Sequence, residues 1–170
     1  MKIYIIGYMC SGKSTVGKRL AQKLNYSFID LDFYFEEKFH ISVDDFFTKY
    51  GENAFRKIET QLLNDILVKD NIVISTGGGT PCFNENMNVM RKNGVSIYLK
   101  MHINSLKDRI LNSKKKRPLL KNISEENVTD FLSNHLNERE AFYQQADYTV
   151  KGENADIEEM VKLIRCREND

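Results

Sequence analysis

Short apolar runs alternate along the chain with longer segments in which apolar positions recur every three or four residues. The apolar runs predict five strands, at 2–6, 27–31, 71–75, 95–100 and 148–150. The amphipathic segments predict helices that begin near residues 14, 33, 53, 84, 105, 125 and 156. Two runs, 3–6 and 72–74, are continuously apolar, as in strands buried on both faces. This alternation predicts an α/β fold whose parallel sheet is covered by helices on both faces.

The composition agrees with one such domain. The chain has 170 residues, of which 41% are hydrophobic and 29% are charged, and this length ordinarily forms one core. We find no internal repeat and no linker rich in proline or glycine, so we predict a single domain over 1–170. Lys and Arg total 25 against 24 Asp and Glu, a balance that gives no reason to expect nucleic acid as a partner.

The N-terminal apolar run ends at Gly7 and is too short for a secretion signal. No stretch approaches the roughly 20 apolar residues of a spanning helix. The three cysteines, Cys10, Cys82 and Cys166, form no CxxC pair and indicate reduced thiols. We therefore predict a cytoplasmic protein without a membrane partner.

The stretch GYMCSGKST, which begins at Gly7, fits the phosphate-binding pattern GxxxxGK[ST]. An apolar strand precedes it and an amphipathic helix follows it. Gly7 and Gly12 permit turns that point successive N–H groups at an anion, and the helix N-terminus favours negative charge. A plain strand–turn–helix corner is the alternative, and the two flanking elements favour phosphate. The ATP-binding residues predicted in this loop are Cys10, Ser11, Gly12, Lys13, Ser14 and Thr15.

Acidic and basic residues lie where an acceptor would bind, because ligands of open α/β sheets sit beyond the carboxyl ends of the strands. Asp30 and Asp32 follow the second strand, and alternation would place both on one side. One could serve hydrated Mg²⁺ and the other an acceptor hydroxyl. Arg56 flanks a buried helical stripe, and Glu59 could hold it in position for a carboxylate ligand. The alternatives are an exposed strand end for the two aspartates and a surface ion pair for Arg56 and Glu59.

Two further features point to the same region. Three consecutive glycines at 77–79 are too many for a tight turn alone and suggest backbone lying close against a small ligand. The basic segment SKKKRPLLKN at 113–122 interrupts two helical patterns and predicts a loop, which carries Arg117. Arg139 supplies a second arginine from the penultimate helix. The three histidines show no metal-ligand spacing, and we expect them to be structural or exposed.

Taken in order, these motifs resemble the shikimate kinase family over nearly the whole chain: GxxxxGKST, Asp-x-Asp, Phe-Arg-x-x-Glu, Gly-Gly-Gly, Arg-Pro-Leu-Leu and Glu-Arg-x-x-x-Tyr. The phosphate loop is shared with many families, but the ordered set is specific. The resemblance implies a three-layer α/β/α P-loop fold with a five-stranded parallel sheet, a substrate-binding helical region and a lid at about 113–122. It implies that a monomer transfers the ATP γ-phosphoryl group to the 3-hydroxyl of shikimate, with Mg²⁺.

The resemblance also assigns roles to individual residues. Catalytic roles would belong to Lys13, Asp32 and Arg117. The metal would be held by Ser14 and, through water, by Asp30. ATP would also contact Arg109 and Arg117. The substrate-binding residues would be Asp32, Arg56, Gly77, Gly78, Gly79 and Arg139.

Cys10 departs from the family, which usually has a small residue there, often glycine. We expect its backbone N–H to face phosphate nonetheless, and its thiol to be open to alkylation that ATP blocks. Two other functions stay open as alternatives. One is a P-loop kinase for gluconate or a nucleoside monophosphate. The other is a regulatory P-loop ATPase, which would want acidic residues where the third strand ends in Ser75-Thr76-Gly77.

Overall fold

A single parallel sheet forms the centre of the protein, whose structure is a computed structural model that describes residues 1–113 and 127–168. The strands are β1 (Lys2–Ile6), β2 (Ser27–Asp30), β3 (Ile72–Ser75), β4 (Val95–Lys100) and β5 (Tyr148–Lys151). Their order across the sheet is β2-β3-β1-β4-β5. Every pair is parallel, and Ile3 of the central strand lies opposite Val73 on one side and Val95 on the other. The predicted α/β class is confirmed.

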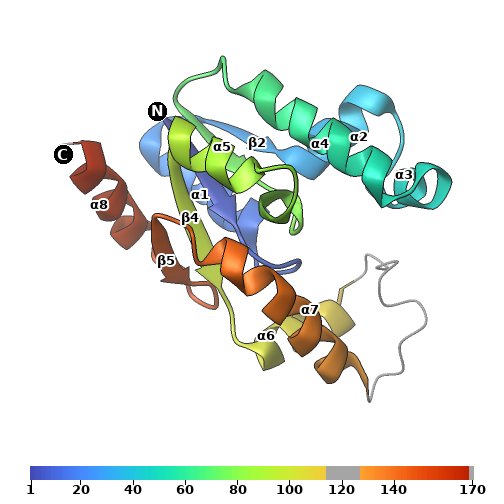
Figure 1. Cartoon of the computed structure of the whole chain (residues 1–170). Helices are drawn as coiled ribbons and strands as arrows, with labels where there is room; N and C mark the ends of the chain where they lie inside the picture. The colour runs from blue at the N-terminus through green and yellow to red at the C-terminus, as the bar shows by residue number, and fades with distance from the viewer. Residues whose placement is uncertain (114–126, 169–170) are drawn as a thin grey trace.

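Helices lie between successive strands, and one helix follows the last strand. Before β3 they are α1 (Lys13–Leu24), α2 (Leu31–Phe39), α3 (Val43–Tyr50) and α4 (Glu52–Ile66). After β3 they are the short 3₁₀ helix η1 (Thr80–Cys82), α5 (Asn86–Asn93), α6 (Ile103–Leu111), α7 (Val128–Tyr143) and α8 (Ile157–Glu168). Figure 1 shows α2, α3 and α4 gathered on one side of the molecule and α8 on the opposite side, beside β5.

Alternation along the strands divides the core into two layers. Ile3 and Ile5 of β1 face a cluster built with residues of α1 and α8, such as Leu20 and Met160. Tyr4 and Ile6 point the other way, into a larger cluster built with α2 to α7. Helices therefore cover both faces, as strands that are apolar on both sides require. The result is the predicted three-layer α/β/α arrangement.

Helix α3 was not predicted. It has 8 residues, and Ser42 begins it by accepting a hydrogen bond from the Asp45 N–H at 3.0 Å. The helix was nonetheless predictable, because its apolar residues follow the helical spacing i, i+3, i+4, i+7: Val43, Phe46, Phe47 and Tyr50. Its position matters for function, because it lies between α2 and α4 beside the cavity described below.

The predicted second strand, 27–31, is one residue too long, so strand alternation does not position Asp32 relative to Asp30, although both line the cavity described below. Strand β2 ends at Asp30, whose carboxylate accepts a hydrogen bond from the Phe33 N–H at 3.3 Å and so caps α2. Asp32 therefore lies in the first turn of α2. The sequence contained the signal, since Asp is a favoured N-cap residue. In the described ranges 1–113 and 127–168, no helix is long and apolar enough to cross a membrane.

Candidate active site

The loop between β1 and α1 has the backbone shape that a phosphate cradle needs. Gly7 and Gly12 have φ values of 144° and 95°, which side chains rarely adopt. A Cβ on Gly7 would also lie 2.8 Å from the Leu99 carbonyl oxygen. No side chain caps the N-terminus of α1, where Gly12 stands. The first N–H groups of the helix are thus oriented toward the cavity as an anion site.

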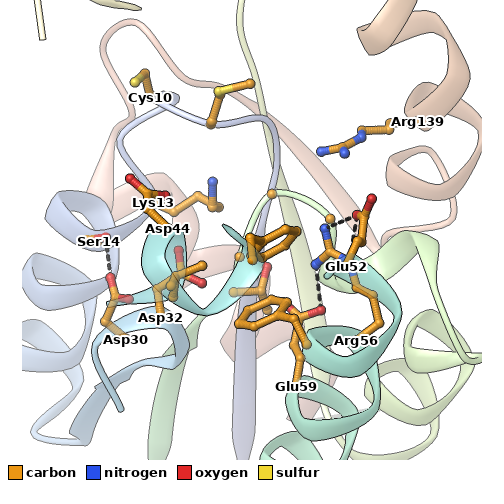
Figure 2. Close-up of a pocket in the computed structure, with 18 of the residues that line it drawn as sticks. Cys10, Lys13, Ser14, Asp30, Asp32, Asp44, Glu52, Arg56, Glu59 and Arg139 are labelled. Atoms are coloured by element: carbon orange, nitrogen blue, oxygen red, sulfur yellow. Dashed lines mark hydrogen bonds and ion pairs between the residues drawn. The ribbon is translucent and has the colours of Figure 1, made fainter. Parts of the chain in front are cut away.

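Lys13 lies in the same loop and is buried, with 8% of its surface exposed. Its ammonium donates a hydrogen bond to the Tyr8 carbonyl at 2.7 Å, which holds the side chain back across the loop. Ser14, the next residue, donates its hydroxyl hydrogen bond to the Asp30 carboxylate. A hydroxyl and a carboxylate oxygen therefore lie together at the start of α1, beside the phosphate cradle (Figure 2).

Arg56 forms the centre of a second group, on α4. Its Nη1 donates to Glu59 at 2.7 Å, and its Nε and Nη2 donate to one oxygen of Glu52 at 3.1 and 2.9 Å. The guanidinium lies over the Phe83 ring, 4.4 Å from its centroid. Burial disfavours the charge, but Glu59 and Glu52 outweigh it and raise the pKa of Arg56 above its ordinary value. The side chain is therefore a fixed cation.

The three glycines explain how Arg56 fits. A Cβ on Gly79 would lie 2.3 Å from Arg56 Nη2. A Cβ on Gly77 would lie 2.8 Å from a Glu59 oxygen and 2.9 Å from an Asp32 oxygen. The backbone of the three glycines therefore lies close to charged side chains of the site, and its expected contact with a small ligand stays a prediction.

Helix α7 completes the site from the opposite side. Arg139 points into the cavity toward the α4 group (Figure 2). One turn further on, the buried hydroxyl of Tyr143 donates to the Gly78 carbonyl at 2.6 Å. Glu140 turns the other way and accepts from the Tyr98 hydroxyl at 2.7 Å and from Lys100 at 2.8 Å. These bonds fix α7 to the glycine loop and to β4, so the position of Arg139 is well defined.

One cavity of about 550 Å³ brings most of the predicted residues together. The predicted site residues that line it are Cys10, Gly12, Lys13, Ser14, Thr15, Asp30, Asp32, Arg56, Gly77, Gly78, Gly79 and Arg139. Ser11 is buried inside the loop and is not among the lining residues. Arg109 is exposed on α6, where its Nη1 donates to the Ser11 and Cys10 carbonyl oxygens at 3.2 and 3.4 Å. Arg117 and most of the expected lid at 113–122 lie outside the described residues.

Three ionisable residues of the cavity, Asp44, Glu52 and His135, were not predicted. Glu52 lies four residues before Arg56, and His135 lies four residues before Arg139. Residues four apart share a helix face, so this spacing could have placed Glu52 and His135 beside the two predicted arginines. Asp44 lies on α3, and without that helix nothing in the sequence placed it at the site.

Cys10 has φ 60° and thus takes the left-handed conformation that suits glycine. A β-branched side chain is strongly disfavoured there. Relative to Cys10→Gly, we expect Cys10→Val to lower the free energy of unfolding by at least about 1–2 kcal/mol, the usual cost of this conformation for a residue with a Cβ, and to weaken ATP binding. Cys10→Gly is the control, and it should be at least as stable as the wild type and keep its affinity for ATP. Urea unfolding and ATP titration measure the two effects, and a Val variant as stable as the Gly variant would contradict the explanation.

A phosphate loop at the end of β1, with two arginines and two aspartates around one cavity, defines a P-loop phosphotransferase for a small acidic acceptor. Comparison with known proteins identifies the family. The family model described as shikimate kinase matches residues 9–166, and this chain belongs to the shikimate kinase family.

Individual relatives agree with this assignment. A shikimate kinase from Azobacteroides pseudotrichonymphae is 49% identical over 146 residues, which cover 85% of this chain and 86% of that protein. The crystal structure of shikimate kinase from Bacteroides thetaiotaomicron superposes with a TM-score of 0.88 at 40% identity, over 99% of this chain and 97% of that chain. The shikimate kinase from Acinetobacter baumannii in complex with shikimate also gives a TM-score of 0.88, at 30% identity, over 99% of this chain and 95% of that chain.

Proposed function

We propose that the chain transfers the γ-phosphoryl group of ATP to the 3-hydroxyl of shikimate, giving shikimate 3-phosphate and ADP in aromatic amino acid biosynthesis. Membership of the shikimate kinase family supports this. The observation that carries the proposal is the single cavity that is lined both by the phosphate loop and by Arg56 and Arg139. One end suits the phosphates of the donor, and the other suits a small acid with hydroxyl groups.

The donor half uses the loop and Lys13. Backbone N–H groups of the loop would hold the phosphate oxygens, and Lys13 would neutralise charge on the β- and γ-phosphates. To reach the phosphates, the Lys13 ammonium would break its hydrogen bond to the Tyr8 carbonyl or keep it while donating a second one. Arg109 would lie against the nucleotide, a role that its two bonds to loop carbonyls support. We assign Arg117, which lies outside the described residues, to the transferring phosphoryl group.

The acceptor half uses Asp32 and the two arginines. Asp32 would accept the proton of the attacking hydroxyl as general base. Arg56 and Arg139 would bind the acceptor carboxylate from two helices. Glu52 and Glu59 occupy three of the five N–H groups of Arg56, which leaves one on Nη1 and one on Nη2 for a ligand. Gly78 and Gly79 would lie against the ring. Phosphoryl transfer requires positioning and charge neutralisation more than covalent catalysis, and these residues supply both.

Mg²⁺ is the proposed metal. The Ser14 hydroxyl and the Asp30 carboxylate are bonded to each other beside the cradle, and oxygen donors are what Mg²⁺ prefers. Across 1–113 and 127–168, no cluster of three His, Cys, Asp or Glu residues could hold a metal ion. That fits Mg²⁺, which keeps several waters and uses one or two protein oxygens with the phosphates. When bound, it would neutralise charge on the phosphates.

We further propose a single-domain monomer that works in the cytoplasm. The all-parallel sheet with both faces covered supports one domain. The three cysteines are free thiols, as is usual in a reducing compartment. Size-exclusion chromatography with light scattering tests the oligomeric state directly.

A coupled assay of ADP release with shikimate, gluconate and nucleoside monophosphates tests the proposed acceptor. We expect turnover with shikimate and rates at the background level with the others, because among these acceptors only shikimate combines a carboxylate with ring hydroxyls. A preference for gluconate or a nucleoside monophosphate would favour another small-molecule kinase. Equal ATP hydrolysis with every acceptor would indicate an ATPase.

A further inference from the structure

A hydrogen bond between Tyr8 and His135 joins the phosphate loop to α7. Tyr8 Oη and His135 Nδ1 are 2.6 Å apart. The Tyr8 side chain is buried, and its ring meets the imidazole edge-on with centroids 5.5 Å apart. Phe131 stacks on the imidazole at 5.4 Å. The orientation of the His135 ring is therefore fixed by two aromatic neighbours and one hydrogen bond.

This bond determines which imidazole nitrogen carries the proton. Burial raises the pKa of the Tyr8 hydroxyl above its ordinary value, so it stays protonated and can donate. Burial is the main cause that lowers the pKa of His135, and the positive charges of Arg139 and Arg56 lower it further. The carboxylates of Glu138 and Glu52 oppose this shift without reversing it. The ring is therefore neutral at pH 7. A neutral imidazole that accepts at Nδ1 carries its proton on Nε2.

The remaining nitrogen is available to a ligand. His135 lines the same cavity as Arg139 and precedes it by one turn on the same face of α7. Within the described ranges, Tyr8 is the one hydrogen-bond partner of His135. A histidine that served only as the hydrogen-bond partner of the buried Tyr8 hydroxyl would not need to line the cavity. A neutral His135 beside the cationic Arg139 would instead donate a directional hydrogen bond to a carboxylate. It would add no further positive charge, to which the phosphates of ATP would also be attracted.

We propose that His135 binds the substrate, donating a hydrogen bond from Nε2 to the carboxylate of the acid acceptor beside Arg139. Tyr8 is the positioning residue that fixes this tautomer. The acceptor's identity rests on the proposed function. Because the contact exists only with the acceptor, loss of His135 affects the KM for shikimate and leaves the KM for ATP unchanged.

Three variants separate binding from packing. His135→Leu removes the donor, and we expect the KM for shikimate to rise about ten-fold, the effect of one hydrogen bond to a charged group. His135→Gln keeps an N–H and should recover most of the loss. The double variant Tyr8→Phe, His135→Leu leaves no unpaired hydroxyl, so it should regain stability while its KM for shikimate stays high. A double variant with the wild-type KM would overturn the proposal.

A measurement on the wild-type protein needs no variant. Long-range ¹H–¹⁵N NMR spectra should show His135 protonated on Nε2, and saturating shikimate should shift the Nε2 signal. The exposed His40 is the control in the same spectrum and should not move. A mixture of tautomers, or an unchanged Nε2 signal, would overturn the inference. If the same preparation fails to phosphorylate shikimate at all, the proposed function fails; if it does phosphorylate shikimate but the signal stays unchanged, only the inference about His135 fails.

Discussion

Asp32→Asn should lower kcat by about a hundred- to ten-thousand-fold, the usual contribution of a general base, while the affinity for ATP stays within about two-fold of wild type. The amide keeps the shape of the side chain but cannot take the proton of the attacking hydroxyl. Asp32 lies in the first turn of α2 and lines the cavity between the phosphate loop and Arg56. Steady-state kinetics with shikimate, together with calorimetric titration of ATP, measure both quantities.

The control is Asp65→Asn, which makes the same change on the exposed end of α4 and removes only a surface pair with Lys38. We expect its kcat to equal that of wild type. An Asp32→Asn variant that keeps more than a tenth of wild-type kcat would show that another group takes the proton.

Arg56→Lys should raise the KM for shikimate by about 10–100-fold, the loss of a charge-assisted hydrogen bond worth about 1.5–3 kcal/mol. Lysine keeps the charge, but one ammonium cannot donate to Glu52, Glu59 and a ligand in the directions that the planar guanidinium provides. The variant also weakens the pairing of Glu59, which is only 2% exposed. We therefore expect a lower free energy of unfolding as well.

Arg91→Lys, an identical change on the exposed face of α5, should alter neither quantity. The informative comparison is the KM for shikimate against the KM for ATP, because general damage to the fold would raise both. An Arg56→Lys variant with an unchanged KM for shikimate would remove Arg56 from the acceptor site.

The fold was predictable because its signals are local. β1 and β4 have the predicted bounds, 2–6 and 95–100, because strands buried on both faces are mostly apolar and stand out locally in the sequence. The phosphate loop was predictable for the same reason, because its glycines and Lys13 are adjacent in the chain. The missed helix α3 was also predictable from a local signal, because its apolar residues have helical spacing. What the sequence does not show is the packing of its Phe47 against Phe55 of α4.

The site was only partly predictable, because its geometry depends on contacts between distant segments. The three glycines indicated a close contact of the backbone, but not its partner, because the rest of α4 and all of β3 lie between Arg56 and Gly79 in the chain. The bond between Tyr8 and His135 joins residues 127 positions apart. No local pattern encodes such a pair, so His135 could be expected only to be structural or exposed.

The most direct test of the account is the identity of the product. Incubation of the wild-type protein with ATP, Mg²⁺ and shikimate, followed by ³¹P NMR, should show ADP and one phosphate monoester coupled to the proton on C3 of shikimate. That result requires the phosphate loop, Asp32 and the arginines to act on one acceptor in one cavity. Inorganic phosphate without an ester, or an ester on another hydroxyl, would contradict it.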